Sequence, residues 1–416
     1  MKSYLLRLGK KAKIISTKNL NSKKKDKVLN DYCKLLSNNK LKIIFENKKD
    51  LKKARTKKLK ENLVTRLSID EKKILQIIKA IKSIVKFKDP VNQTLKKWKR
   101  PNGLKIEKKT TPIGTIAVIY ESRPNVTSDV ACLCFKSGNP VILKGGSEAY
   151  YSNKILTNLF RESLKKNNIN QDYVQLISYK NRKIVDFLLT KMIGYIDVII
   201  PRGGKGLVKK VQDLSKIPVI GHLEGICHTY IDKNADLSMA KKITLNAKLR
   251  NTAICGATET ILIHQKLLKK FCNPILENLE NNGCKIIGDN KIKKFYKRKI
   301  KTATEKDWTK EYLLPIVSVK SVKNVNEAIN HINKYGTMHT DAIITKNINS
   351  AKKFLKEVKS SIAMHNTSTQ FADGGEFGFG GEVGISTNTL PPRGPVGLNQ
   401  LVSYKYQVSS KGKIRK

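Results

Sequence analysis

The sequence predicts an α/β fold with doubly wound parallel sheets, because apolar runs alternate with amphipathic stretches along most of its length. Residues 115–120 and 140–144 are apolar almost throughout, as in strands that are buried on both faces of a parallel sheet. Helices fit residues 126–137 and 147–166, so strands and helices follow one another from here on. A chain of 416 residues is long enough for about two or three structural units.

The same alternation continues toward the end of the chain. Strands are expected at 173–177, 198–200, 228–232, 260–264, 316–319 and 341–345, and helices at 236–247, 266–281, 325–335 and 348–358. Residues 373–384 combine many glycines with phenylalanine and glutamate, which predicts a loop with close backbone approach rather than a flexible linker. Two further strand-like segments, 104–108 and 401–406, would each leave an unpaired edge in a monomer.

Residues 1–100 are expected to be helical, since apolar residues recur at helical spacing, for example over 74–85. Ser68 and Glu71 have the spacing of a capping box and predict a helix start, and Pro90 ends that helix. The chain is therefore expected to begin with a helical segment that precedes the first strand of the parallel sheet.

The formal net charge of +50 raises the question of a nucleic-acid-binding protein. The lysines greatly outnumber the arginines and are spread over nearly the whole chain rather than gathered in one basic stripe. Proteins that grip phosphates favour arginine for its bidentate contacts, so compositional drift explains the charge better. Nucleic-acid binding is kept as the alternative from another class of function.

Other features of the composition indicate a reducing, cytoplasmic setting. No apolar run is long enough to cross a membrane, and the start of the chain lacks a secretory apolar region. The seven cysteines are odd in number and scattered, and none forms a C-x-x-C pair with metal-ligand spacing. We therefore expect reduced thiols and no metal site.

Cys255 lies where a helix that starts near Asp236 gives way to a buried strand, a junction at which a thiol can face a cleft. A cysteine more often fills a core, so this position needs support from other residues. Glycine pairs follow two of the expected strands, at 145–146 and 203–204. Turns at the carboxyl ends of parallel strands line crevices that bind nucleotides, and Lys144 could meet a ribose or a phosphate at this edge.

Nine stretches match a known family in the same order along the chain. They are residues 120–127, 143–149, 200–206, 222–228, the segment 246–264 around Cys255, 331–336, 373–378, 393–395 and 403–405. Over essentially its whole length the chain resembles the gamma-glutamyl phosphate reductases, also called glutamate-5-semialdehyde dehydrogenases, which belong to the aldehyde dehydrogenase superfamily.

The resemblance implies an aldehyde dehydrogenase-like fold with two doubly wound α/β domains, one for the cofactor and one catalytic, and a small β oligomerisation flap. It implies at least a homodimer, because equivalent strands in the superfamily pair with a neighbouring subunit, and it leaves open a transient contact with glutamate 5-kinase. The expected division is an NADP-binding domain at 1–101 and 113–226, a catalytic domain at 227–386, and oligomerisation strands at 102–112 and 387–416.

The implied reaction reduces L-glutamyl 5-phosphate with NADPH to L-glutamate 5-semialdehyde and phosphate, the second step of proline biosynthesis from glutamate. By resemblance, the Cys255 thiolate attacks the acyl phosphate and expels phosphate, and a hydride then reduces the thioester. The side chain of Asn125 and the backbone N–H of Cys255 would hold the oxyanion that develops. The alternative enzyme is an NAD-dependent semialdehyde dehydrogenase, which oxidises its substrate.

The resemblance also assigns a cofactor site. It implies Lys144 and Ser147 for the adenosine ribose and its 2'-phosphate, Arg202, Gly203 and Gly204 for the pyrophosphate, and Glu311 for the nicotinamide ribose. A cation and a hydroxyl at the end of a strand, without a repelling carboxylate, predict a preference for NADPH over NADH. For Glu311, the alternative is a plain surface acid.

Some positions depart from the related enzymes. His222 stands where hydrolytic aldehyde dehydrogenases place a glutamate that activates water, and Glu224 could be a displaced base. Without that base, reduction of a thioester fits better than aldehyde oxidation. Gln370 replaces an arginine that the family commonly has, which puts anion binding there in doubt. Cys227 lies in a matching stretch and is expected only to pack.

Overall fold

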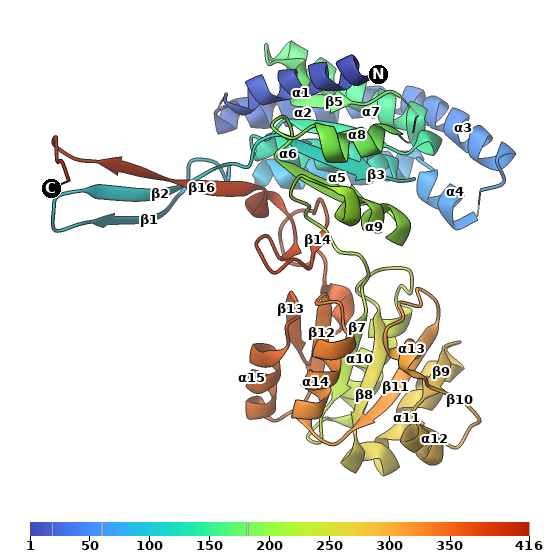
Figure 1. Cartoon of the computed structure of the whole chain (residues 1–416). Helices are drawn as coiled ribbons and strands as arrows, with labels where there is room; N and C mark the ends of the chain where they lie inside the picture. Colours follow the sequence, from blue (N-terminus) through green and yellow to red (C-terminus); the bar gives the residue numbers. More distant parts are fainter. Residues whose placement is uncertain (19, 60, 180, 182, 416) are drawn as a thin grey trace. The chain divides into compact units, whose positions relative to one another are not determined.

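The computed structural model describes residues 1–18, 20–59, 61–179, 181 and 183–415, and the chain forms two compact units (Figure 1). Unit 1 contains Met1–Gly221, Gly378–Gly384 and Val396–Lys416, and unit 2 contains His222–Phe377 and Ile385–Pro395. Unit 2 begins at His222, close to the expected border between 226 and 227, and the division into NADP-binding, catalytic and oligomerisation parts stays a prediction. Lys416, the last residue of the expected oligomerisation segment, lies outside the described residues.

A parallel four-stranded sheet in the order β5-β4-β3-β6 forms the centre of unit 1. Its strands are β3 (Ile116–Tyr120), β4 (Val141–Gly145), β5 (Val174–Leu176) and β6 (Val198–Arg202). Its helices are α1 (Lys2–Ser16), α2 (Ser22–Asn38), α3 (Lys40–Thr56), α4 (Glu61–Leu67), α5 (Glu71–Lys86), α6 (Pro124–Lys136), α7 (Tyr150–Lys166), α8 (Lys183–Lys191) and α9 (Lys205–Leu214). Neighbouring residues of a strand point to opposite faces, so Val118 packs with α2, α5, α6 and α7, whereas Ala117 packs with α1, α8 and α9.

The N-terminal segment is helical up to the end of α5, as predicted, but two details differ. Asp70, not Ser68, caps α5, because its side chain accepts a hydrogen bond of 2.7 Å from the backbone of the first turn. The helix ends at Lys86, well before Pro90. Residues 94–99 form strand β1 (Thr94–Lys99) rather than helix.

Strand β1 belongs to a three-stranded antiparallel sheet with β2 (Lys105–Pro112) and β16 (Val402–Ser409), in the order β1-β2-β16. This sheet extends away from the helices of unit 1 in Figure 1. The two segments that were expected to be strands, 104–108 and 401–406, pair with each other here. Sequence reasoning missed β1 because its residues are rich in lysine and mostly exposed, so they show no apolar run.

A parallel seven-stranded sheet in the order β10-β9-β11-β8-β7-β12-β13 forms the centre of unit 2. Its strands are β7 (Cys227–Ile231), β8 (Thr258–His264), β9 (Lys285–Gly288), β10 (Lys301–Thr302), β11 (Ile316–Val322), β12 (Thr340–Ile344) and β13 (Ile362–His365). Its helices are α10 (Leu237–Leu249), α11 (Leu268–Asn281), α12 (Asn290–Phe295), α13 (Glu305–Trp308), α14 (Val325–Tyr335) and α15 (Ile348–Glu357), and β14 (Ile385–Ser386) pairs with β15 (Gly394–Pro395).

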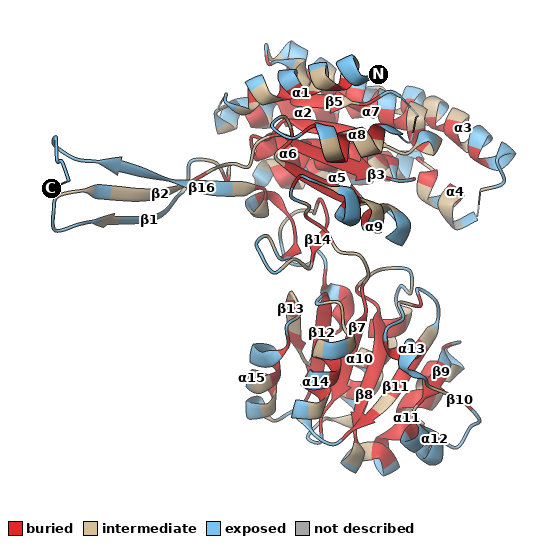
Figure 2. Cartoon of the chain, viewed as in Figure 1, coloured by how far each residue is buried: buried red, intermediate tan, exposed pale blue. Residues whose placement is uncertain are grey.

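The two faces of this sheet carry separate apolar cores. Ile231, Ile261 and Ile344 pack with α10 and α11 on one face, and Tyr230 and Leu262 pack with α14 and α15 on the other. Figure 2 shows the strands of both central sheets as buried. Helices on both faces of each sheet confirm the predicted doubly wound class. Within the described part of the chain, none of the helices is both long and apolar enough to cross a lipid bilayer.

Candidate active site

Cys255 lies in the segment between α10 and β8, residues 250–257, which we call the Cys255 loop. All seven cysteines are described; six are buried, and Cys255 is partly exposed. Burial raises the pKa of the Cys227 thiol well above its ordinary value, so this neighbour is held in its neutral form. Cys255 is therefore the cysteine that a substrate can reach.

The other candidate residues of unit 2 also lie at the amino ends of strands. His222 and Gly225 precede β7, Glu311 precedes β11, and His339 directly precedes β12. The strands β11, β8, β7 and β12 are neighbours in this order. Segments that are far apart in sequence therefore meet along one edge of the sheet.

Two contacts fix the Cys255 loop. Lys248, at the end of α10, and Glu259, on β8, form an ion pair of 2.6 Å in which both side chains are 0% exposed. Burial raises the pKa of Glu259 to about 7, and the charge of Lys248 acts to lower it. On the β7 side, Gly225 lies so close to the carbonyl of Cys255 that a Cβ there would collide with it. The loop is thus held at both of its ends and along its flank.

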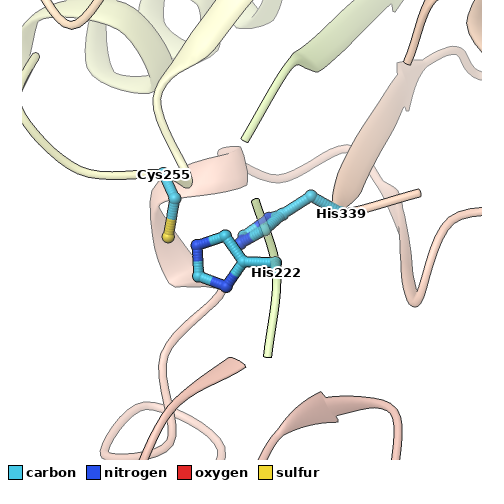
Figure 3. Close-up of side chains that lie close together, drawn as sticks. All are labelled: His222, Cys255 and His339. Atoms are coloured by element: carbon cyan, nitrogen blue, oxygen red, sulfur yellow. The ribbon is translucent and has the colours of Figure 1, made fainter. Parts of the chain in front are cut away.

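His222, Cys255 and His339 form a cluster, in which one nitrogen of each ring and the Cys255 sulfur all lie within 4.8 Å of one another. Figure 3 shows the sulfur pointing toward the ring of His222, with the ring of His339 beside it. The two rings meet edge to face, with centroids 4.9 Å apart. Sequence reasoning missed His339 entirely, since only the strand order brings it next to Cys255; Glu224 is not a member of the cluster.

A hydrogen bond fixes how the imidazole of His222 carries its proton. Nδ1 of His222 lies 2.8 Å from the carbonyl oxygen of Ile385, which can only accept, so Nδ1 carries the proton and Nε2 the lone pair. Nδ1 of His339 lies 2.9 Å from the hydroxyl of Thr340. Burial lowers the pKa of His339 well below its ordinary value, so this ring is neutral. The cluster thus places an imidazole that can accept a proton beside the thiol.

Glu311 is partly exposed, and its Oε1 accepts a hydrogen bond of 2.8 Å from the backbone N–H of Gly225. Because Gly225 touches the Cys255 loop, this bond brings the carboxylate to the same edge of the sheet as the thiol. The contact argues against a plain surface acid. The role in holding the nicotinamide ribose stays a prediction.

A pocket of about 410 Å³ lies beside the Cys255 loop. The charged and polar groups that line it are Lys242, Asn246, Arg250, Asn366, Thr367, Ser368, Gln370 and Glu376. Gln370 donates to the backbone oxygens of Ala247 and Asn251 at 2.9 and 3.2 Å. Its Oε1 accepts a hydrogen bond of 3.2 Å from Nε of Arg250. A cation, Arg250, therefore lines the pocket beside the neutral Gln370.

Lys144 and Ser147 lie at the carboxyl edge of the sheet in unit 1. Lys144 is 8% exposed and donates to the carbonyl of Gly145 at 2.8 Å, and burial lowers its pKa. The expected absence of a carboxylate is wrong, because Oε2 of Glu148 lies 3.5 Å from the Ser147 hydroxyl. Glu148 is held there by the backbone N–H and the hydroxyl of Ser122, at 3.0 and 2.8 Å.

Arg202 ends β6, and Gly204 caps α9 at the same edge. The backbone N–H of Gly204 donates to Oε2 of Glu121 at 2.8 Å. A Cβ on Gly203 would come within 2.6 Å of the same oxygen, so the Glu121 side chain would have to shift. Arg202 faces Glu382 at 3.9 Å. A helix N-terminus beside an arginine suits an anion. In this structure the Glu121 carboxylate accepts the hydrogen bond from Gly204, which is a bond that a phosphate could also accept.

Asn125 lies in the first turn of α6, in unit 1, and its Nδ2 donates to Oδ2 of Asp129 at 3.1 Å. Burial raises the pKa of Asp129 to about 6, while the hydrogen bond from Asn125 acts to lower it. Asn125 thus lies in unit 1, as do the expected cofactor residues Lys144, Ser147, Arg202, Gly203 and Gly204, whereas the cofactor residue Glu311 lies in unit 2 with His222 and Cys255.

Comparison with known proteins identifies the family of this chain. The model of the aldehyde dehydrogenase family matches residues 21–290 and 300–402. The chain belongs to the aldehyde dehydrogenase family. A gamma-glutamyl phosphate reductase from Bartonella tribocorum is 46% identical over 90% of this chain and 91% of its own length. One from Brucella suis is 44% identical over 95% of this chain and 93% of its own length. These relatives confirm the resemblance found in the nine stretches.

Solved structures confirm the aldehyde dehydrogenase-like fold. The crystal structure of gamma-glutamyl phosphate reductase from Thermotoga maritima has a TM-score of 0.96 and 40% identity, and the match covers 99% of this chain and 100% of that chain. A glyceraldehyde-3-phosphate dehydrogenase from Methanocaldococcus jannaschii, complexed with NADP, has a TM-score of 0.67 and 16% identity over 99% of this chain and 95% of that one. The second likeness is one of fold alone. The chain is an oxidoreductase of this family.

Proposed function

We propose that the protein reduces L-glutamyl 5-phosphate to L-glutamate 5-semialdehyde and phosphate, as a step of proline biosynthesis from glutamate. Its similarity to gamma-glutamyl phosphate reductases at 44–46% identity over most of the chain supports this reaction. The observation that carries the mechanism is the cluster of Cys255 with His222, because Cys255 is the partly exposed cysteine and an imidazole lies beside it.

Cys255 is the nucleophile of the proposed reaction. His222 takes the thiol proton, and the thiolate attacks the acyl carbon, so that a carbon–sulfur bond forms. The carbon–oxygen bond to phosphate then breaks, and phosphate leaves with the bonding pair. When the aldehyde is finally released, the carbon–sulfur bond breaks and its electron pair returns to sulfur as thiolate. His222 therefore ionises the thiol once and keeps its proton through later cycles.

A bound nicotinamide cofactor would supply the hydride that reduces the thioester carbon. The oxyanion formed there needs two donors, for which we assign the backbone N–H of Cys255 and the side-chain amide of Asn125. A His222 that already holds the thiol proton cannot take a second one from water. This favours reduction over the alternative, an NAD-dependent semialdehyde dehydrogenase, because that enzyme needs a base to hydrolyse its thioester.

NADPH is the cofactor that we propose. Lys144 fits the 2'-phosphate, because an anion would offset the burial that lowers its pKa. Arg202, with Gly203 and Gly204 at the start of α9, fits the pyrophosphate. The remaining assignments are Ser147 for the 2'-phosphate and Glu311 for the nicotinamide ribose. Glu148 opposes the preference for NADPH, since its carboxylate lies beside the Ser147 hydroxyl.

The pocket beside the Cys255 loop is the proposed site of the glutamyl group. The glutamyl group carries an α-carboxylate and an α-ammonium, so a pocket that binds it needs both cationic and anionic side chains. Arg250 and Lys242 supply cations and Glu376 supplies an anion in this pocket. Thr369 lies between the lining residues Ser368 and Gln370, and a Cβ built on Gly256 would lie 3.0 Å from its carbonyl oxygen, so the segment that lines the pocket adjoins the residue after the nucleophile.

A reverse assay tests the proposal, with NADP reduction by L-glutamate 5-semialdehyde measured in the presence and absence of phosphate. A strict requirement for phosphate is expected, since the product is an acyl phosphate. Cys255→Ala should abolish turnover while cofactor binding persists, and Cys284→Ala serves as a control from the buried core. Full turnover without phosphate would support the NAD-dependent semialdehyde dehydrogenase instead. An active Cys255→Ala with an inactive Cys227→Ala would show that the nucleophile is wrongly assigned.

We also propose at least a homodimer, formed through the sheet of β1, β2 and β16. The large side chains of β16 support this, because Tyr404, Tyr406 and Val408 are 49%, 56% and 57% exposed. Strand β16 is also an outer strand of its sheet among the described residues.

We also propose that the protein acts in the cytoplasm and that it does not bind nucleic acid. A transient contact with glutamate 5-kinase stays an expectation raised by the sequence alone.

A further inference from the structure

We propose that His222, Cys255 and His339 bind one Zn²⁺ ion, and that the bound ion stops the reaction by occupying the Cys255 sulfur. One thiolate and two imidazoles are donors that Zn²⁺ prefers in tetrahedral sites. Among the described residues, this is the group of three potential ligands that lies close enough together for one ion. The inhibition rests on the proposed function, in which this sulfur is the nucleophile, whereas binding of the ion does not.

The positions of the three donors fit a single ion. Zinc bonds of about 2.3 Å to sulfur and about 2.0 Å to nitrogen place tetrahedral ligands about 3.3–3.6 Å apart. The ligand atoms of His222, Cys255 and His339 all lie within 4.8 Å of one another, so small side-chain rotations suffice to close the site. Figure 3 shows the sulfur and both rings converging on one space.

Both imidazoles are oriented as zinc ligands usually are. A ligating histidine typically donates its other ring N–H to a neighbouring oxygen, which fixes the ring and leaves a lone pair for the metal. Nδ1 of His222 donates to the carbonyl of Ile385, and Nδ1 of His339 lies 2.9 Å from the Thr340 hydroxyl. Nε2 of His339 is buried and has no hydrogen-bond partner among the described residues. A buried polar atom without a partner costs free energy, and a metal ion would supply the missing partner.

Binding needs no change of oxidation state. Coordination displaces one proton to solvent, from the Cys255 thiol or from His222 where that ring already holds it, and the lone pairs of two ring nitrogens complete three protein ligands, with water in the fourth position. The zinc–sulfur bond must break before the sulfur can attack an acyl carbon. Zinc and substrate therefore compete for one atom, and a chelator should restore activity.

Titration calorimetry of the untagged chain with chelator-buffered Zn²⁺ tests the site. We expect one ion per chain, and His222→Gln and Cys255→Ala should each raise Kd more than about 100-fold, beyond the 10–100-fold that loss of an outer hydrogen bond costs. His365→Gln is the matched control, since His365 is also partly exposed and its Nε2 lies 2.9 Å from the carbonyl of Thr345. Thr340→Val should raise Kd about tenfold, because it removes the hydroxyl 2.9 Å from Nδ1 of His339 and leaves Cys227 Sγ at 3.6 Å as its neighbour. Equal Kd values for wild type and Cys255→Ala would overturn the proposal.

Co²⁺ gives a second readout that does not depend on activity. A thiolate-to-cobalt absorption band should be present in wild type and His365→Gln and absent in Cys255→Ala. In the reverse assay, Zn²⁺ should inhibit, the semialdehyde should protect, and a chelator should reverse the loss. Full turnover with the site saturated by zinc would overturn the inhibitory role. An inactive protein that still binds one ion through Cys255 would refute the proposed function and support the site.

Discussion

Replacing Lys248 with methionine is expected to destabilise unit 2 by about 3–5 kcal/mol, the cost of leaving one buried charge without its partner. Nζ of Lys248 lies 2.6 Å from Oε2 of Glu259, and neither side chain is exposed. After the change, the Glu259 carboxyl is buried without a cation. It keeps a proton, because the neutral acid costs less free energy to bury than the carboxylate. Its pKa, raised by burial to about 7, lies above the ordinary 4.5 and rises further. The folded protein then holds a proton that the unfolded chain releases, so the deficit grows as the pH rises.

Differential scanning calorimetry measures this loss. For a unit of this size, each kcal/mol lowers Tm by about 2–4 °C, so a fall of about 6–20 °C is expected. The double variant Lys248→Met/Glu259→Gln removes both charges and should stay within about 2 kcal/mol of wild type. Lys353→Met breaks an exposed pair with Glu357 on α15, 3.8 Å long, and should cost less than about 0.5 kcal/mol. A Lys248→Met protein within about 1 kcal/mol of wild type, or a double variant as unstable as the single one, would refute the reasoning.

Four further predictions address the cofactor, the pH dependence of stability, the substrate and the assembly. Glu148→Gln removes a carboxylate from the turn after β4 and should raise kcat/KM for NADPH relative to NADH about fivefold; an unchanged ratio would show that this charge has no effect. The pKa of Asp129, about 6, lies above its usual 3.8, so the native state keeps a proton that the unfolded chain releases. Wild-type stability in urea should therefore fall by about 1–2 kcal/mol as the pH rises from about 4 to about 6.5, whereas that of Asp129→Asn should not. Arg250→Met should raise KM for the semialdehyde about tenfold to a hundredfold with little change in kcat. Tyr404→Glu with Tyr406→Glu should give a monomer in sedimentation, and an intact dimer would count against the flap interface.

The strands at the centre of both sheets could be predicted because their signal is local. The runs 115–120 and 260–264 are apolar enough to form strands wherever the fold places them, and they became β3 and β8. Strand β1 could not be found in this way, because it has no apolar run. Its backbone pairing with β2 stabilises it instead. Strand β10 is too short, at Lys301–Thr302, to leave a pattern.

The site divides in the same way between local and long-range causes. Cys255 and the residues of the matching stretches could be named from the sequence, since motif and spacing are local features. His339 could not, because it reaches the thiol only through the order β8-β7-β12 in the sheet. Glu148 was visible in the sequence, but its carboxylate is fixed beside Ser147 by hydrogen bonds from Ser122, which lies far from it along the chain. Arg250 is likewise positioned in the pocket by a long-range contact, the hydrogen bond from its Nε to Gln370.

The central claim is that Cys255 carries the glutamyl group as a thioester, and mapping of the acylated peptide tests it most directly. The protein is mixed with NADP and L-glutamate 5-semialdehyde without phosphate and quenched in acid, which protonates the α-amino group and prevents its attack on the thioester. We predict that about one equivalent of NADPH forms per chain and that one glutamyl group is found on the peptide that contains Cys255. Cys255→Ala should show neither. Continuous turnover without phosphate, or a glutamyl group on Cys227 or another residue, would contradict the account.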